Sequence, residues 1–335
     1  MTTSSLPIDA IVLAGPTASG KTDLLDELFG RGANSTMPHL QKQLQCDAQG
    51  VDIISADSMQ AYRGMDIGTA KPDPDLLRRL PHYLIDIRDP REQYTVGDFV
   101  NLADQACASS RARGRLPIVA GGTGFYVKNF LCGLPGAPRC DPVIRQQVQA
   151  DLEGRGPDAL RKELAEADPR LAASIKPRDL YRLSRAVEIL RQTGKPPSSF
   201  APSASLREGR RFLVLGITRP REELHERINA RVEAMFARGL AEEVGSLRAR
   251  GYGPDDPGMQ AIGYREFFEM DGKPVEDIKA AIALHTRQYA KRQMTFFRAL
   301  PGIRWVDPTP EALRAAILDM LSSLFLLDTR NTHEV

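Results

Sequence analysis

Short apolar runs rich in β-branched residues recur along the chain and predict strands. They span Ile8–Ala14, Val51–Ala56, Leu84–Ile87, Leu116–Ala120, Phe212–Ile217 and Ile303–Val306. Most intervening segments carry helical spacing instead. Between Leu224 and Leu247 an apolar residue returns every three or four positions, which predicts one long helix or two in sequence, beginning near Pro220. This alternation predicts an α/β fold with a mainly parallel sheet flanked by helices.

Turn-rich segments divide the chain at 133–142 and 194–209, where Gly, Pro and Ser are frequent. The stretch between them shows helical patterns and no convincing strand. We therefore expect residues 1–140 and 201–320 to form one α/β core and residues 141–200 to form a helical insertion. Residues 321–335 are expected to hold the end of the last helix and a tail, frayed over Asp328–Val335. The polar stretch Arg31–Gly50 is expected to be a surface loop or a short extra helix.

Composition narrows the class of protein. The chain has 335 residues, of which 42% are hydrophobic and 26% charged, and this is ordinary for a globular protein. No apolar run approaches the roughly 18 residues of a membrane span. The four cysteines form no CxxC pair, which argues against a zinc site or a disulfide framework. We expect a cytoplasmic protein of about two domains, without membrane contact and monomeric.

Charge is unevenly distributed, although the formal net charge is only +2. Residues 1–60 hold three basic and seven acidic residues, whereas 278–306 hold six basic residues and no acidic one. Residues 176–195 also hold six basic residues, against two acidic ones. Such stretches suit binding to a polyanion, or they are solvated helix faces.

The strongest motif is GPTASGKT at 15–22, which lies between a predicted strand and a helical pattern beginning at Asp23. It matches the phosphate-binding loop GxxxxGK[ST], in which backbone amides and a helix start surround phosphate oxygens. Lys21 would supply a charge to the phosphates, and Thr22 would place its hydroxyl on Mg²⁺. The sequence therefore predicts a P-loop NTPase-like core that binds phosphates. The motif does not say which molecule carries them.

Two further segments are placed at the same edge of the sheet. Asp57 follows the strand Val51–Ala56, and its carboxylate would organise Mg²⁺, accept a proton from a nucleophile, or cap a helix. The glycine-rich turn 121–124, with the Thr123 hydroxyl, would face the ligand or simply form a close strand–helix turn. In the ordered loop 64–72, Lys71 would either reach an anion or be solvated.

Eight motifs together resemble one known family, the tRNA dimethylallyltransferases, also called the IPP transferase family. They are GPTASGKT (15–22), ISADSMQ (54–60), YRGMDIGTAKP (62–72), HYLID (82–86), VAGGTGFY (119–126), RLSRAVEI (182–189), AIGYRE (261–266) and TRQYAKRQ (286–293). They occur in the family's order across nearly the whole chain. The chain departs from the family in an extra stretch near Asn34–Gln49, to which we assign no function. The zinc finger of some eukaryotic relatives is absent.

The resemblance implies transfer of a dimethylallyl group from dimethylallyl diphosphate to N6 of the adenosine 3′ of the anticodon, position 37, in tRNAs that read codons beginning with U. It implies the tRNA anticodon stem-loop as partner, while the phosphate chemistry itself favours Mg²⁺ as cofactor. The implied donor site is Gly15, Thr17, Ala18, Ser19, Gly20, Lys21, Thr22 and Arg227, with Thr22 as metal ligand. The implied catalytic residues are Asp57, Thr123 and Lys21. The implied tRNA contacts are Asp57, Ser58, Met59, Gln60, Thr123, Arg145, Tyr181, Arg182, Leu183, Ser184, Arg185, Gln260, Ala261, Ile262, Gly263, Tyr264, Arg265 and Glu266.

The chemistry of the residues agrees with this implication. An exocyclic adenine amine is a poor nucleophile and needs an acceptor such as Asp57, while Lys21, loop amides and Mg²⁺ stabilise the leaving diphosphate. Three alternatives remain open: a kinase of a small molecule or nucleotide, a prenyltransferase acting on free AMP, ADP or ATP, and a non-catalytic phosphate-loop regulator. The basic stretches favour an RNA substrate, because a small metabolite does not require them.

Overall fold

The computed structural model describes residues 6–31, 33–44, 48–201 and 203–331. The chain divides into two compact units. The first combines Met1–Leu131 with Leu206–Val335, and the second is Cys132–Ser205. The segment expected from the sequence to be an insertion, 141–200, falls within the second unit.

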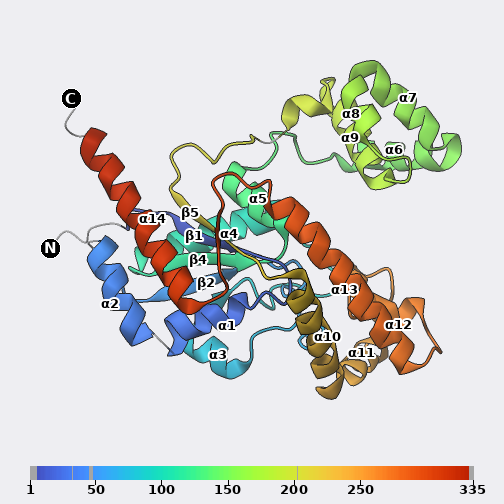
Figure 1. The fold of residues 1–335 in the computed structure, drawn as a ribbon. Helices are drawn as coiled ribbons and strands as arrows, with labels where there is room; N and C mark the ends of the chain where they lie inside the picture. The colour runs from blue at the N-terminus through green and yellow to red at the C-terminus, as the bar shows by residue number, and fades with distance from the viewer. Residues whose placement is uncertain (1–5, 32, 45–47, 202, 332–335) are drawn as a thin grey trace. The chain divides into compact units, whose positions relative to one another are not determined.

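A six-stranded sheet, parallel throughout, forms the centre of the first unit (Figure 1). Its strands are β1 (Ala10–Ala14), β2 (Val51–Ser55), β3 (His82–Tyr83), β4 (Leu116–Gly121), β5 (Phe212–Ile217) and β6 (Arg304–Val306). Their order is β3-β2-β4-β1-β5-β6, so β1 lies between β4 and β5. This confirms the predicted α/β class with its parallel sheet, and it gathers the carboxyl ends of β1, β2 and β4 at one edge.

The third strand differs from the prediction. The expected run Leu84–Ile87 is not a strand; β3 comprises only His82 and Tyr83, and the chain then bends. Leu84 and Asp86 adopt left-handed backbone conformations, with φ of 67° and 56°. A strand cannot continue through such residues, because its φ is negative throughout. The bend instead brings the Asp86 side chain to Lys71.

Five helical segments cover one face of the sheet: α1 (Lys21–Leu25), the π-helix η1 (Asp26–Arg31), α2 (Ala33–Leu44), α3 (Pro74–Arg79) and α14 (Pro310–Asn331). Their apolar residues join Ile11 and Leu13 of β1 in one core. The stretch 31–50 therefore contains a helix rather than a surface loop, and Leu40 is fully buried in that core. Helix α14 continues to Asn331, so fraying from Asp328 is wrong for the described residues; 332–335 lie outside them.

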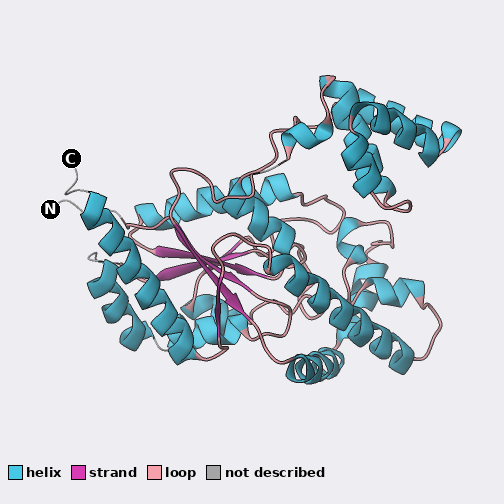
Figure 2. Ribbon diagram, turned by 45° about the horizontal axis from the view of Figure 1, so that its top comes forward, coloured by secondary structure: helices cyan, strands magenta, loops and turns pink. Residues whose placement is uncertain are grey.

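The opposite face is covered by α4 (Val96–Ala112) and α5 (Gly124–Cys132), as Figure 2 shows. Aromatic side chains fill this interface. The rings of Phe99 and Tyr126 stack with centroids 4.7 Å apart, and Phe130 lies 5.3 Å from Phe212 of β5. This packing fixes the first turn of α5 beside the carboxyl end of β4.

A third group of helices follows β5: α10 (Arg221–Ala237), α11 (Leu240–Ala249), the 3₁₀ turn η3 (Pro257–Gln260), α12 (Arg265–Glu269) and α13 (Val275–Phe297). The periodic stretch 224–247 is thus two helices, separated at Gly239, whose φ of +93° suits only glycine. Leu224 and Ile228 of α10 pack against Ala290 of α13 and against Ala18. Helices α10 and α13 therefore lie against the turn that follows β1.

The second unit is helical. It contains α6 (Pro142–Arg155), α7 (Pro157–Ala167), α8 (Pro169–Ser174), α9 (Leu180–Thr193) and the 3₁₀ turn η2 (Pro197–Phe200), around a core that includes Leu160, Leu183 and Val187. Leu131 and Arg207 belong to the first unit and flank the second unit in the sequence. The Arg207 amide donates to the Leu131 carbonyl oxygen at 2.9 Å. The chain therefore leaves and re-enters the first unit at neighbouring points.

Among the described residues, none of the helices has the length and apolar character needed to cross a membrane.

Candidate functional site

The turn after β1 forms a compact phosphate loop. Gly20 has a φ of +91°, and α1 begins at the next residue. The Lys21 ammonium lies back over the loop and donates to the carbonyl oxygens of Gly15 at 2.8 Å and Pro16 at 2.9 Å. Burial lowers the pKa of Lys21 to about 7, which nearby Asp57 partly opposes and Arg231 reinforces. Within the described residues, no carboxylate forms an ion pair with this half-buried amine, so it is suited to receiving an anion.

Arginines from α10 and the turn before it surround the other side of this loop. Arg219 donates from Nε to the Ser19 carbonyl oxygen, and Arg227 donates from Nε to that of Ala18, each at 2.8 Å. Arg231 follows Arg227 by one helical turn, and burial lowers its pKa. The predicted ligand Arg227 therefore lies beside the phosphate loop, with Arg231 on the same helix face.

Asp57 and Thr123 form the neighbouring wall, at the ends of β2 and β4. The Met59 amide donates to Asp57 Oδ1 at 2.9 Å, and the Ser58 amide donates to Thr123 Oγ1 at 3.0 Å. No helix starts after β2, where residues 58–61 form a turn, so the helix-cap alternative for Asp57 is wrong. Gly121 permits the close approach, because a Cβ there would lie 2.2 Å from the Ala56 carbonyl oxygen.

Helix α13 joins the two walls through Gln293. Its Oε1 accepts from the Thr17 amide at 2.9 Å, and its Nε2 donates to the Gly122 carbonyl oxygen at 2.7 Å. Tyr289, one turn earlier, lies near Thr123 and Gln293, and burial raises its pKa to about 12. Its hydroxyl therefore stays protonated at neutral pH.

A cavity of about 870 Å³ lies within the first unit beside the phosphate loop, Asp57 and Gln293. The predicted residues Ser58, Met59 and Thr123 lie next to it in sequence but are not among its lining residues. It is lined by the predicted residues Thr17, Ala18, Ser19, Gly20, Lys21, Thr22, Asp57, Gln60 and Arg227. It is also lined by Lys71, Arg231, Arg238, Tyr289 and Gln293, among others. Thr22 lines this space, and its hydroxyl has no hydrogen-bond partner within the described residues. No cluster of three or more His, Cys, Asp or Glu in that part of the chain could hold a metal.

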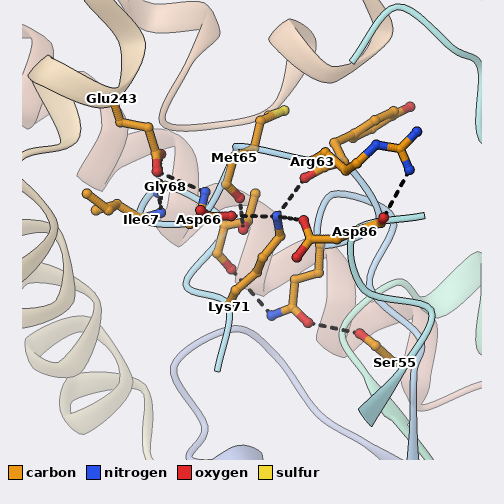
Figure 3. Close-up of polar contacts among 12 residues, drawn as sticks. Ser55, Arg63, Met65, Asp66, Ile67, Gly68, Lys71, Asp86 and Glu243 are labelled. Carbon is orange, nitrogen blue, oxygen red and sulfur yellow. Dashed lines mark hydrogen bonds and ion pairs between the residues drawn. The ribbon is translucent and has the colours of Figure 1, made fainter. Parts of the chain in front are cut away.

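The loop 64–72 forms one edge of the cavity, and Figure 3 shows its polar contacts. Lys71 is neither solvated nor free for an anion. Its buried ammonium donates to the Tyr62 carbonyl oxygen at 2.6 Å and pairs with Asp66 at 2.7 Å and Asp86 at 2.5 Å. Both alternatives for Lys71 are therefore wrong, and its role in this structure is to order the loop.

Glu243 of α11 secures the same loop from outside. Its carboxylate accepts the amides of Asp66, Ile67 and Gly68 at 2.9, 2.9 and 3.3 Å (Figure 3). It also accepts the Tyr264 hydroxyl at 2.6 Å. Inside the loop, Gln60 accepts from the Ser55 hydroxyl at 2.9 Å and donates to the Thr69 and Ala70 carbonyl oxygens. A continuous hydrogen-bond network therefore links α11 to the end of β2.

The predicted tRNA contacts at 260–266 differ in accessibility. Ala261, Tyr264 and Glu266 are buried. Glu266 accepts from the Gly263 amide and lies 2.7 Å from His285 Nδ1. Ile262 and Arg265 are half-buried, and Gln260 is exposed. Gln260 and Arg265 border a separate hollow of about 480 Å³.

The candidates in the second unit also divide into exposed and buried residues. Tyr181 is 82% exposed, and Arg182 is exposed beside Asp179. Arg185 donates to the Pro138 carbonyl oxygen and pairs with Glu188, which Arg145 also approaches at 3.7 Å. Ser184 is half-buried. Leu183 is fully buried in the core of this unit, so its side chain is unavailable to a ligand.

Four cavity residues were not predicted as ligand candidates: Arg231, Arg238, Tyr289 and Gln293. Arg219, which holds the Ser19 carbonyl from outside the cavity, was not predicted either. The spacing of Arg231 and Arg238 from Arg227, four and eleven positions, is a helical signal that could have found them. Tyr289 and Gln293 lie within the quoted motif 286–293. No sequence pattern near Tyr289 and Gln293 indicates contact with a phosphate loop about 270 positions earlier in the chain.

Comparison with known proteins supplies the family. A model described as IPP transferase matches residues 60–300. A tRNA dimethylallyltransferase of Geobacter sulfurreducens is 41% identical over 89% of this chain and 91% of its own length, and one of Anaeromyxobacter dehalogenans is 42% identical over 90% and 97%.

Solved structures agree with the sequence matches. The tRNA isopentenylpyrophosphate transferase of Bacillus halodurans superposes with a TM-score of 0.64 at 34% identity, covering 97% of this chain and 99% of that one. A eukaryotic dimethylallyltransferase acting on tRNA gives 0.70 at 28% identity, covering 90% and 74%. The matched span of sequence and the shared parallel-sheet architecture lead to one conclusion: this chain belongs to the IPP transferase family.

Proposed function

We propose that this protein transfers the dimethylallyl group of dimethylallyl diphosphate to N6 of the adenosine 3′ of the anticodon, in tRNAs that read codons beginning with U. The single observation that carries the proposal is the cavity shared by the phosphate loop and Asp57, which allows a diphosphate and a nucleophile to meet. Its family membership and the tRNA-directed names of its relatives support the same reaction.

The donor diphosphate would lie in the phosphate loop. The amides of residues 17–22 and the start of α1 point positive charge at this space. Lys21, Arg227 and Arg231 add three cations around it. The apolar tail would then extend toward Asp57 and Thr123. Recognition of the tail, rather than of the phosphates, separates this donor from ATP.

Mg²⁺ fits the donor site through Thr22. Thr22 lines the cavity, its hydroxyl has no partner among the described residues, and the remaining metal ligands would be diphosphate oxygens and water, as is usual for this ion. When bound, Mg²⁺ neutralises charge on the diphosphate. The described residues offer no multi-carboxylate cage, which is consistent with a metal that arrives with the substrate.

The chain's own residues account for the transfer. N6 of the adenine forms a bond to C1 of the donor as the bond from C1 to the diphosphate oxygen breaks, and diphosphate leaves with the electron pair. Asp57 Oδ1 is held by the Met59 amide, and Oδ2 has no hydrogen-bond partner within the described residues. Oδ2 would accept the proton that N6 loses. Lys21 stabilises the charge that develops on the leaving oxygen.

N6 of the acceptor adenine would reach the donor only when that base has moved out of the stack of the anticodon loop. Ser58, Met59, Gln60 and Thr123 border the place where that base would lie. The contacts proposed elsewhere are Arg145, Tyr181, Arg182, Ser184, Arg185, Gln260, Ile262 and Arg265. Leu183, Ala261, Gly263, Tyr264 and Glu266 would act by packing, because they are buried. We expect the enzyme to act in the cytoplasm as a monomer.

A transfer assay tests this function. Labelled dimethylallyl diphosphate and Mg²⁺ are supplied without ATP, and tRNA, AMP and ATP are compared as acceptors. We expect label in tRNA alone, loss of transfer in Asp57→Asn, and normal transfer in the exposed control Asp255→Asn. Label in AMP or ATP would indicate a free-nucleotide prenyltransferase. A strict requirement for ATP hydrolysis would return the protein to the kinase or ATPase class.

A further inference from the structure

Three successive backbone amides of loop 64–72 converge on one carboxylate. The amides of Asp66, Ile67 and Gly68 all donate to Glu243 (Figure 3), and the Ile67 amide bonds both carboxylate oxygens, at 3.2 and 2.9 Å. Consecutive amides aimed at one point form an anion-binding concavity, or nest. We call these three amides the amide nest. The anion that fills it belongs to the chain itself and comes from α11, 177 positions after Asp66.

Tyr264 completes the contact between Glu243 and the amide nest. Its hydroxyl donates to Glu243 Oε1 at 2.6 Å and accepts from the Gly68 amide at 3.1 Å. Because burial raises the pKa of Tyr264, this hydroxyl stays protonated and keeps its donor. A Cβ at Gly68 would lie 2.4 Å from the Tyr264 ring, so the ring packs directly on the loop backbone. Two side chains from beyond β5 therefore fix the position of the amide nest.

The other end of the loop fixes the orientation of Gln60. The Gln60 amide group donates from Nε2 to the carbonyl oxygens of Thr69 and Ala70 at 3.4 and 3.3 Å, and its Oε1 accepts from the Ser55 hydroxyl at 2.9 Å. A primary amide has a donor end and an acceptor end, so the two loop carbonyls decide which end faces the loop. These two bonds are long, and a small shift of the loop would break them. Gln60 and Ala70 both line the cavity.

The remaining anchor of the loop does not replace Glu243. Lys71 pairs with the Asp66 and Asp86 carboxylates, so it holds side chains at the two ends of this segment. Within the described residues, no group except Glu243 accepts from the amides of Asp66 and Ile67. Glu243 itself does not line the cavity. Any effect of Glu243 on the reaction must therefore pass through the loop.

We propose that Glu243 is a positioning residue for prenyl transfer: by filling the amide nest it holds loop 64–72, and the loop holds the Gln60 side chain in one orientation beside the acceptor base. The proposal rests on the proposed function for the nature of that base. The donor diphosphate is bound by the phosphate loop and α10, which Glu243 does not contact. Glu243 therefore affects the transfer step and leaves donor affinity unchanged.

Replacement of Glu243 by alanine tests the proposal. Glu243→Ala should lower the single-turnover rate at saturating tRNA by about 10- to 100-fold, because a displacement of about 1 Å in a positioning contact costs up to about 100-fold. Its affinity for dimethylallyl diphosphate, measured by calorimetry, should equal that of the wild type. Formate should restore part of the rate, with chloride at equal ionic strength as the reference, because a small carboxylate can enter the vacated amide nest. A general loss of stability would not produce this rescue.

The matched control is Glu242→Ala, which removes the same charge from the neighbouring position of α11. Glu242 is exposed and forms no hydrogen bond or ion pair within the part of the chain described, so this variant should keep the wild-type rate. If Glu243→Ala does not fold, Glu243→Gln takes its place. It keeps the shape of the side chain but turns an NH₂ group toward an amide donor, and it should lower the rate by a smaller factor.

Three results would overturn the proposal: a wild-type rate in the folded Glu243 variant, a loss of donor affinity equal to the loss of rate, or no gain from formate in Glu243→Ala. If wild-type protein transfers no prenyl group to tRNA, the proposed function fails instead. Hydrogen–deuterium exchange then decides whether Glu243 holds the loop. Faster exchange of the Ile67 and Gly68 amides in the variant supports this role, and unchanged exchange refutes it.

Discussion

Lys21 makes donor binding depend on pH. Burial lowers its pKa to about 7 in the free protein, so about half of the molecules carry an uncharged amine at neutral pH. A diphosphate within about 4–6 Å favours the ammonium and raises this pKa by about 1–3 units. The protonated form therefore binds the donor more tightly than the neutral form.

The size and sign of the effect follow from linkage. Below pH 7 Lys21 is charged in both free and bound protein, and affinity for the donor is at its maximum. Above pH 7 the free protein must take up a proton to bind, so affinity falls about tenfold per pH unit until the raised pKa is reached. A raised pKa of about 8–10 makes the total loss about 10- to 1000-fold.

Calorimetric titration with dimethylallyl diphosphate between pH 6 and pH 10 measures this loss. The informative quantity is the ratio of wild-type to Lys21→Ala affinity, because the titration of the diphosphate itself cancels. Arg227→Ala is the matched control: it should bind more weakly yet retain the pH dependence, since an arginine stays charged throughout. A ratio that is constant across this range would refute the lowered pKa and its coupling to the donor.

Three further outcomes are expected. Asp57→Asn should lower the single-turnover rate by about 100-fold or more with little change in tRNA affinity; a normal rate would remove the proton-accepting role. Lys71→Met should lower the free energy of unfolding by about 1–3 kcal/mol in urea denaturation, because the buried Tyr62 carbonyl loses its donor; unchanged stability would contradict the ordering role. Arg182→Ala with Arg185→Ala should lower the salt slope of tRNA binding by about 1.4–1.8, and a wild-type slope would exclude phosphate contacts there.

The sequence predicted the features that depend on local pattern. The prediction agrees with the structure to within about a residue for the strands at 51–56 and 116–120 and for the phosphate loop. In each case the residues of the segment themselves determine its backbone conformation. The strand predicted at Leu84–Ile87 is wrong, and the reason is again local. Its residues favour strand, but two of them take positive φ, and no side-chain pattern marks that conformation in a non-glycine residue.

The remaining failures come from long-range contacts. Lys71 resembles a surface lysine in sequence, yet the fold brings two carboxylates to it, one of them from a bend 15 positions later. Asp57 is followed by a turn, although a helix commonly follows a strand at this position. The turn leads toward loop 64–72, whose Thr69 and Ala70 carbonyl oxygens accept from Gln60. The short helix that was one alternative for 31–50 is confirmed at 33–44; only its packing was not predicted, because Leu40 belongs to the core that α14 reaches from the far end of the chain.

The hydrogen bond from Arg207 to Leu131 has a consequence for modular engineering. Because the chain leaves and rejoins the first unit at adjacent residues, the sheet and its cavity are complete without any strand from 132–205. The Arg207 guanidinium also binds Asp104 at 2.8 and 2.9 Å, anchoring the return point to α4. Excising the second unit and closing the gap with a short glycine linker is therefore compatible with the remaining topology. Helical modules from other RNA-binding proteins could be grafted at the same junction, separating the design of substrate choice from that of chemistry.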